Sequence, residues 1–313
     1  MRRNRFHYQG LALCFSLFCM TSMPSQAQDI PTDVVCDNDI MDKIEEVIPS
    51  LLKVQPGKYG VSNLKRHISR EIPKEATRKI LEQQKKFGTP QENQPQSGEV
   101  LYEKCCKSTL IFGNYYDCGE CDEMHTGVGT TAIALTEDGI CMTNYHVMED
   151  IIRKDSASLK GDSLFYVGTI DGKAYPITAV LGYSRIDDTA IFKVDTRGDK
   201  LACFPLGDAA KVGSHVNIIS HPKHVLYYYT DGKVSKNSMF KEENMPEMYR
   251  MQVTADFAVG SSGGPVFNDY GQLVGMVAST TGFYFEDDKK ENLQMVVKTT
   301  IPIFRIKHLL GIK

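Results

Sequence analysis

Gly260-Ser261-Ser262-Gly263-Gly264-Pro265 is the most informative stretch of this sequence, and the apolar pair Val266-Phe267 follows it directly. The glycines around Ser262 predict a tight turn that exposes the serine hydroxyl as a nucleophile. In such a turn the backbone N–H groups of Gly260 and Ser262 point inward, where they can stabilise an oxyanion. A Gly-Ser hairpin turn without any chemistry has the same composition, so this interpretation needs support from elsewhere in the chain.

Two further motifs lie upstream of this turn. Thr143-Asn144-Tyr145-His146-Val147 ends an apolar strand that follows the Asp138-Gly139 turn, and Asp188 opens the apolar run Thr189–Val194. Taken alone, a histidine at a strand end is usually structural, and an aspartate there usually forms a turn. Together with Ser262 they supply a base, an acid and a nucleophile in the chain order His, Asp, Ser.

The three motifs together resemble the trypsin-like serine proteases, and the closer likeness is to the HtrA/Deg branch. That branch combines a glycine-rich strand with Thr-Asn-x-His-Val, Asp-x-Ala and Gly-x-Ser-Gly-Gly-Pro. This chain has all four, the first of them as Gly127-Val128-Gly129-Thr130-Thr131. The likeness covers roughly residues 100–313. It implies two antiparallel β-barrels of the chymotrypsin type and hydrolysis of peptide bonds through an acyl-enzyme.

The resemblance also assigns roles to residues. Ser262 is the expected nucleophile, His146 its general base and later acid, and Asp188 the group that orients His146. The N–H groups of Gly260 and Ser262 are the expected oxyanion hole. Asp187 competes for the third role, but the Asp-x-Ala register selects Asp188.

Some positions depart from the family pattern or extend it. Ser261 stands where zymogen-type trypsins have an aspartate that binds a new N-terminus, so we expect no activation of that kind. No sequence follows Lys313 for the PDZ domain of many HtrA proteins, so we expect a member without one. Asp256 stands six residues before Ser262, where trypsin has the acid that selects Lys or Arg. A structural aspartate upstream of the nucleophile is the alternative for Asp256.

The N-terminus has the layout of a secretory signal peptide. Arg2, Arg3 and Arg5 precede the apolar run Leu11–Met20, and Ser25-Gln26-Ala27 suits cleavage after Ala27. The apolar run is too short to span a bilayer, which needs about 20 residues. We therefore expect residues 1–27 to be removed from an exported chain, periplasmic or extracellular, with no membrane insertion afterwards.

Residues 28–88 predict a small helical domain. Apolar residues recur at helical spacing over Ile40–Leu52, then through Leu64, Ile68 and Ile72, and a third helix is expected from Pro73 to Phe87. Residues 89–99 read as a polar linker. From Val100 onward, short runs rich in Val, Ile, Thr and Tyr alternate with turn residues, which is typical of an all-β domain over 100–313. Ile303–Ile312 again has helical spacing.

The resemblance to the HtrA/Deg branch does not cover the helical segment. It could cover the active-site cleft, pair protomers through the apolar stripe Ile40–Leu52, or simply pack on the barrels. A homo-oligomer is therefore one of the possible assemblies of this chain.

Seven cysteines remain after removal of the signal peptide, and export places them in an oxidising setting. Cys105, Cys106, Cys118 and Cys121 bracket the first expected strand, with His125 nearby. We expect disulfides among these four, while a structural zinc site and a redox Cys-x-x-Cys pair are the alternatives.

The expected function is that of an exported serine endopeptidase acting on proteins or peptides, without a cofactor. A net charge of −3 gives no reason to expect nucleic acid as a partner. The rival interpretation is a non-catalytic relative that uses the same fold to bind peptides or partners.

Overall fold

The computed structural model describes residues 33–54, 57–88, 94–153, 163–241, 243 and 245–312. The chain divides into two units after Val34, and of the first unit only residues 33 and 34 are described. The second unit contains every helix and strand discussed below. The expected signal peptide, residues 1–27, lies outside the described residues. Among the described helices, none is long and apolar enough to cross a membrane.

Six antiparallel strands close the first barrel in the order β1-β2-β3-β6-β5-β4. Side chains alternate between the two faces of a strand, and both faces of β1 carry buried apolar side chains. Leu110 and Phe112 belong to the core inside this barrel, whereas Ile111 between them belongs to a second apolar cluster on the outside. The strands are β1 (Thr109–Asp117), β2 (Met124–Ala134), β3 (Ile140–Thr143), β4 (Leu164–Gly168), β5 (Ala174–Ser184) and β6 (Thr189–Val194).

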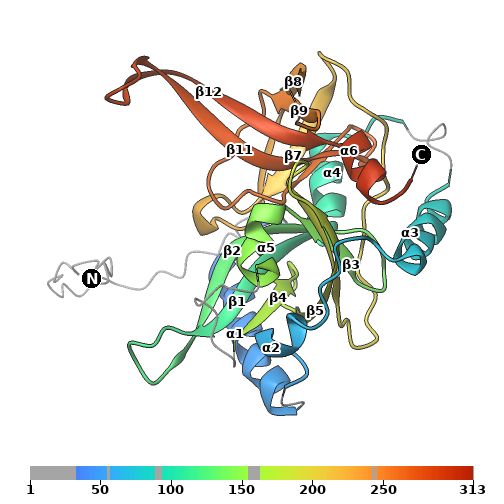
Figure 1. Ribbon diagram of the computed structural model, residues 1–313, viewed down its shortest axis with the longest axis vertical. Coiled ribbons are helices and arrows are strands. Elements are labelled where there is room, and N and C mark those ends of the chain that lie inside the picture. Colours follow the sequence, from blue (N-terminus) through green and yellow to red (C-terminus); the bar gives the residue numbers. More distant parts are fainter. Residues whose placement is uncertain are drawn as a thin grey trace, which may run out of the picture. The chain divides into compact units, whose positions relative to one another are not determined.

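A second closed barrel follows in the order β10-β11-β12-β9-β8-β7, again with antiparallel pairs throughout. Its interior is filled by aliphatic side chains such as Ile218, Val253 and Val266. The predicted all-β fold of two barrels with helices at the N-terminal end is therefore confirmed (Figure 1). The strands are β7 (His215–Ser220), β8 (Tyr228–Phe240), β9 (Met248–Val253), β10 (Pro265–Phe267), β11 (Leu273–Glu286) and β12 (Glu291–Pro302).

The strands β11 and β12 extend far beyond their barrel as one hairpin, whose tip projects from the rest of the molecule in Figure 1. The register runs out to the pair Glu286↔Glu291, so the charged run between them forms the turn. Phe285 near that tip is 78% exposed.

The described residues form six α-helices beside the barrels, and the sequence predicts three of them closely. The first and third helices expected before residue 88 form α1 and α3, and α6 appears within Ile303–Ile312. The prediction of a second helix through Leu64, Ile68 and Ile72 is wrong. Only one helical turn forms, at Val61–Leu64, and Ile68 makes a β-bridge with Val180. The helices are α1 (Asp37–Val54), α2 (Val61–Leu64), α3 (Lys74–Lys86), α4 (Gly98–Cys105), α5 (Tyr145–Ile152) and α6 (Ile303–Leu309).

The apolar stripe of α1 is buried against the first barrel. Ile40, Ile44 and Ile48 lie in an apolar cluster shared with side chains of both barrels. The Cδ1 atom of Ile44 lies 2.6 Å from where a Cβ would stand on Gly168 of β4, so the helix packs closely on the strand at that position. The stripe is therefore already covered within the chain and is not a free surface for pairing protomers.

The segment predicted as a linker is partly structured. The N–H of Gln96 donates to the carbonyl oxygen of Asp269, and α4 begins at Gly98. Residues 89–93 lie outside the described residues. The limits 28–88, 89–99 and 100–313 stay predictions.

Candidate active site

The structure brings together the three residues predicted as a catalytic triad. The Nδ1 atom of His146 lies 2.9 Å from Oδ2 of Asp188, and its Nε2 atom lies 3.1 Å from Oγ of Ser262. A neutral imidazole with its proton on Nδ1 donates to Asp188 and leaves Nε2 free to accept the serine proton. The His146 side chain is 46% exposed, so this group is accessible from solvent.

The three side chains come from both barrels. Sequence analysis placed His146 at a strand end, but β3 stops at Thr143 and His146 lies in the first turn of α5. Asp188 occupies the turn before β6 with a positive φ of 45°, and Ser262 lies in the loop between β9 and β10. The backbone N–H of His146 also donates to Oδ1 of Asp188 at 3.0 Å, which ties the helix to that turn.

The competing aspartate has another partner. Asp187 is buried and accepts hydrogen bonds from Nε and Nη2 of Arg305 on α6, at 2.7 and 3.0 Å. It also accepts from the hydroxyl of Ser184 at 3.0 Å. Asp187 thus anchors the turn, while Asp188 alone turns toward His146.

The turn around Ser262 holds the two backbone N–H groups predicted as an oxyanion hole. Within the described part of the chain, the backbone N–H groups of Gly260 and Ser262 donate no hydrogen bond. Gly260 has a φ of +95°, and a Cβ there would stand 2.5 Å from the carbonyl oxygen of His221. Only glycine fits this position, and two donors remain free beside the serine hydroxyl.

Two threonines of β2 hold this turn from the other barrel, and sequence analysis gave them no role. The N–H of Thr131 donates to the carbonyl oxygen of Ser262 at 3.0 Å, and the hydroxyl of Thr130 donates to the same oxygen. The hydroxyl of Thr131 donates to the carbonyl oxygen of Gly260 at 3.1 Å. These contacts fix the nucleophile turn against the barrel that carries His146.

Asp256, the candidate specificity residue, is paired within the chain. Its Oδ1 atom lies 2.6 Å from Nζ of Lys298 on β12, and the Lys298 side chain is only 13% exposed. Lys298 also donates to the carbonyl oxygen of Phe257. Asp256 thus has an ion-pair partner within the chain, although its own side chain is 78% exposed to solvent, which weakens the pairing.

His221 is buried behind the oxyanion turn and was not singled out in the sequence. Its Nδ1 atom accepts the N–H of Tyr227 at 3.0 Å, and its ring lies edge-on to the Tyr227 ring. Burial lowers the pKa of His221 to about 3, so the ring is neutral across the physiological range.

The four cysteines predicted to form disulfides do not form one cluster. Cys105 and Cys106 are buried before β1, whereas Cys118 and Cys121 are exposed beyond its other end. A strand of nine residues separates the two pairs, which is a span of roughly 26 Å. No disulfide joins the cysteines of the described residues. A bond between the two pairs is excluded by this distance.

Cys118 and Cys121 lie close together. Their Sγ atoms are 3.4 Å apart, and Sγ of Cys121 is 3.0 Å from Nε2 of His125. The backbone N–H of Glu120 and the thiol of Cys121 lower the pKa of Cys118 to about 7.

The chain is similar in sequence to known proteins over much of its two-barrel part. The family model described as trypsin-like peptidase domain matches residues 130–276. A probable periplasmic serine endoprotease DegP-like of Chlamydia pneumoniae is 28% identical over 157 residues, covering 49% of this chain and 30% of that protein. The protein of the same name from Halomonas elongata is 32% identical over 147 residues, covering 45% and 27%. The chain thus matches less than a third of the length of these two relatives.

A plant relative and a solved structure extend the comparison. Protease Do-like 1, chloroplastic, of Arabidopsis thaliana is 28% identical over 189 residues, covering 55% of this chain and 40% of that protein. The structure titled HtrA-type protease AlgW with decapeptide matches with a TM-score of 0.54 and 17% identity, covering 69% of this chain and 66% of that one. The chain therefore carries a trypsin-like peptidase domain and is a homologue of the DegP/HtrA serine proteases.

Proposed function

We propose that this chain is a serine endopeptidase that cleaves proteins or peptides through an acyl-enzyme. The observation that carries the proposal is the pair of contacts made by His146, one to Asp188 and one to the hydroxyl of Ser262. A base within hydrogen-bond reach of a nucleophile and oriented by a carboxylate is the arrangement that acyl transfer requires.

The chemistry follows from these positions. As Oγ of Ser262 attacks the substrate carbonyl carbon, its proton passes to Nε2 of His146. The N–H groups of Gly260 and Ser262 are available to stabilise the negative charge that develops on the carbonyl oxygen. His146 then gives the proton to the leaving amine, and water, activated by the same imidazole, releases the acyl group.

A free strand edge supports a peptide as the substrate. The pairing of β10 with β11 ends at Met276, and the carbonyl oxygen of Ala278 lies 3.4 Å from Oγ of Ser262. Ser279 and Thr280 beyond it are exposed. An extended peptide can add to this edge of β11 by backbone hydrogen bonds, which brings its carbonyl groups to Ser262.

The test of the activity uses two neighbouring serines. We expect Ser262→Ala to lose casein hydrolysis by a factor on the order of 10⁴–10⁶ and to lose labelling by a serine-directed phosphonate probe. The matched control is Ser261→Ala, because the Ser261 hydroxyl is buried and hydrogen-bonded to Ser220, 3.0 Å away. This variant should still be labelled, with the adduct located on Ser262 by peptide mass spectrometry. Undiminished turnover by Ser262→Ala would contradict the proposal, and absence of labelling in the wild-type chain would favour a non-catalytic binding protein.

We also propose that the chain is exported, with residues 1–27 as the signal peptide. The names of the bacterial relatives, which describe them as periplasmic, support this assignment. N-terminal sequencing of the protein from an expressing bacterial host should begin at Gln28. Recovery of the chain only with Met1 intact would contradict it.

A further inference from the structure

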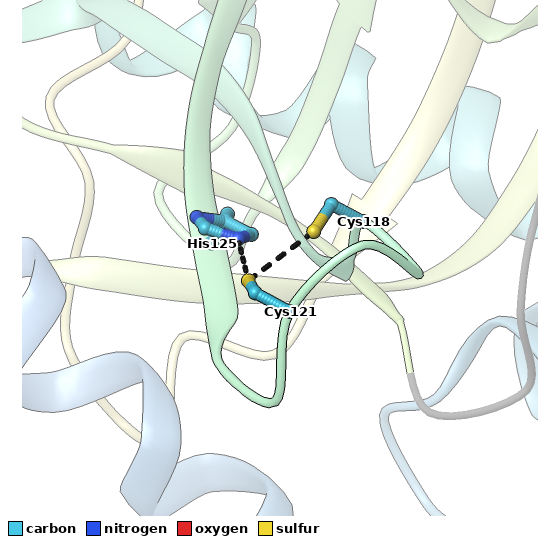
Figure 2. A group of neighbouring side chains, drawn as sticks. All are labelled: Cys118, Cys121 and His125. Carbon is cyan, nitrogen blue, oxygen red and sulfur yellow. Dashed lines mark hydrogen bonds between the residues drawn. The ribbon is translucent and has the colours of Figure 1, made fainter. Parts of the chain in front are cut away.

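The loop that joins β1 to β2 gathers three side chains with metal-binding chemistry. Cys118 follows directly after β1, Cys121 lies in the loop, and His125 is the second residue of β2. The strand register pairs Tyr116 with His125 and Asp117 with Met124. The hairpin therefore returns His125 to the level of the cysteines, as Figure 2 shows.

The donor atoms of these residues converge. Sγ of Cys118 and Sγ of Cys121 are 3.4 Å apart, Nε2 of His125 is 3.0 Å from Sγ of Cys121, and all three atoms lie within 4.8 Å of one another. In a tetrahedral zinc site with bonds of about 2.3 Å to sulfur and about 2.0 Å to nitrogen, the ligand atoms are separated by about 3.6–3.8 Å. Small side-chain adjustments would bring the three atoms to these separations.

The backbone and the charge of the loop also suit a bound cation. The N–H of Glu120 donates to Sγ of Cys118 at 3.4 Å, a contact that compensates negative charge on a thiolate. The N–H of Gly119 donates to Oδ1 of Asp117 at 2.6 Å, which closes the turn. The run from residue 117 to 123 contains Asp117, Glu120, Asp122 and Glu123 and no Lys or Arg. This excess of negative charge favours a divalent cation at the loop.

We propose that Cys118, Cys121 and His125 form a zinc site, with the fourth coordination position open to water or to a ligand from outside. The sequence favours disulfides at these cysteines because export places them in an oxidising setting. The structure removes Cys105 and Cys106 from the group and adds the imidazole. A disulfide between Cys118 and Cys121 would need their sulfurs to approach to about 2.05 Å. It would not account for the contact between His125 and Cys121. Zinc uses all three donors.

The site has a consequence for the hairpin that carries it. The same strand β2 that begins beside His125 later supplies Thr130 and Thr131, which bind the turn around Ser262. A metal at the loop would fix the turn end of this hairpin. The assignment stands on the donor geometry and is independent of the proposed proteolysis.

The test measures metal binding directly, on the protein carrying Ser262→Ala to prevent self-cleavage. The protein is stripped with a chelator, kept reduced with a phosphine, and titrated with zinc against a chromophoric chelator. Cobalt is titrated in parallel, because thiolate ligands give it a charge-transfer absorption band. We expect one zinc ion per chain and the cobalt–thiolate band.

Single variants assign the ligands. Cys118→Ser, Cys121→Ser and His125→Ala should each weaken zinc binding by at least about a hundredfold, more than the loss of an outer hydrogen-bond partner costs. Cys36→Ser is the matched control, since Cys36 is exposed but lies outside the group, and it should bind as the parent does. Far-ultraviolet circular dichroism checks that each variant remains folded.

Three outcomes would overturn the assignment. The first is no stoichiometric zinc in the reduced parent protein. The second is unchanged affinity in His125→Ala, which would limit binding to the cysteines. The third is a Cys118–Cys121 disulfide, found by mass spectrometry after alkylation, in protein that was expressed and isolated with zinc present.

Discussion

Lys298 is the ion-pair partner of Asp256, the candidate specificity residue. Its ammonium group lies 2.6 Å from the Asp256 carboxylate and is held by the Phe257 carbonyl as well. A carboxylate already paired in this way attracts a second cation much less strongly than a free one. The position that matches the trypsin specificity acid therefore has a different electrostatic character in this chain.

Replacement of Lys298 should change the cleavage preference. We expect the parent enzyme to show no preference for Lys or Arg before the cleaved bond, and Lys298→Met to gain one of roughly tenfold, equivalent to about 1.4 kcal/mol. A peptide-library cleavage profile measures both. Lys236→Met, at an exposed position on β8, is the control and should keep the parent profile. A strong parent preference for Lys or Arg would contradict this interpretation of the ion pair.

His221 makes the stability of the fold depend on pH. Its pKa is about 3 in the folded chain and about 6.5 when exposed in the unfolded chain. Between these values the unfolded chain takes up a proton that the folded chain does not, so the free energy of unfolding falls as the pH falls below 6.5. The slope from this residue is at most about 1.4 kcal/mol per pH unit, and the contribution is constant above pH 6.5.

A glutamine in place of His221 removes this titration and keeps an acceptor for the N–H of Tyr227. Urea unfolding of His221→Gln in the Ser262→Ala background, between pH 7 and pH 4.5, should therefore show a flatter dependence than the parent. His308→Gln, at an exposed histidine of α6, should keep the parent slope. Equal slopes in all three proteins would mean that His221 is not buried in a neutral form.

At the scale of elements, α1 is an integral part of the barrel fold. Ile44 is fully buried and meets Gly168 of β4, beside Ile111 of β1. Removing its side chain beyond Cβ deletes contacts with the barrel wall and leaves a cavity. The stability of the first barrel should therefore respond to a change in the helix.

We expect Ile44→Ala to lower the free energy of unfolding by about 2–5 kcal/mol, with one cooperative transition. Near-ultraviolet circular dichroism reports the barrels, because their buried tyrosines, such as Tyr166 and Tyr175, give the signal. Glu46→Ala, on the exposed face of the same helix, should change the value by no more than about 0.5 kcal/mol. Separate transitions for helix and barrel would instead indicate an independent N-terminal domain.

The elements also explain what could be predicted from the sequence. His146, Asp188 and Ser262 were found because each lies in a short motif with its own local pattern. Long-range partners have no such pattern: Arg305 binds Asp187 across 118 positions, and nothing near either residue indicates the other. The four cysteines close in sequence fall into two distant pairs for a related reason, because the extended strand β1 lies between them.

Short helices were missed for a different physical reason. α4 and α5 have eight residues each, which is too few for an apolar period to stand out. The predicted helix through Ile68 failed because tertiary contacts outweighed its spacing, and the chain there pairs with Val180 instead. Local sequence patterns thus predicted the candidate site residues and the fold class. Packing between distant segments determined where the helices and strands begin and end.

For the whole molecule, the turn that carries Asp188 is held from the second barrel. Arg305 of α6 binds the buried carboxylate of Asp187, and Nη2 of Arg250 on β9 donates to the carbonyl oxygen of Ile186 at 2.9 Å. These contacts join the two barrels beside the triad. The orientation of Asp188 therefore depends on the second barrel being in place.

Loss of Arg305 should affect both stability and activity. We expect Arg305→Met to cost about 3–5 kcal/mol, because it leaves the Asp187 carboxylate buried without its partner. Peptide turnover should fall as well, since the neighbouring Asp188 loses its support. Arg305→Lys, which keeps the charge but not the two-nitrogen contact, should lose less on both counts. Thermal unfolding and peptide hydrolysis measure the two effects, and a methionine variant as stable as the parent would contradict the expectation.

The distribution of the triad over two barrels also matters while the protein is being made. A ribosome adds about 5–20 residues per second, so several seconds pass between the addition of Asp188 and that of Arg305. During this interval the growing chain has the histidine and the aspartate, then the serine, but not the last strand and helix that bring them into register. If the chain is the proposed protease, its site is therefore incomplete until the last strand and helix have been synthesised.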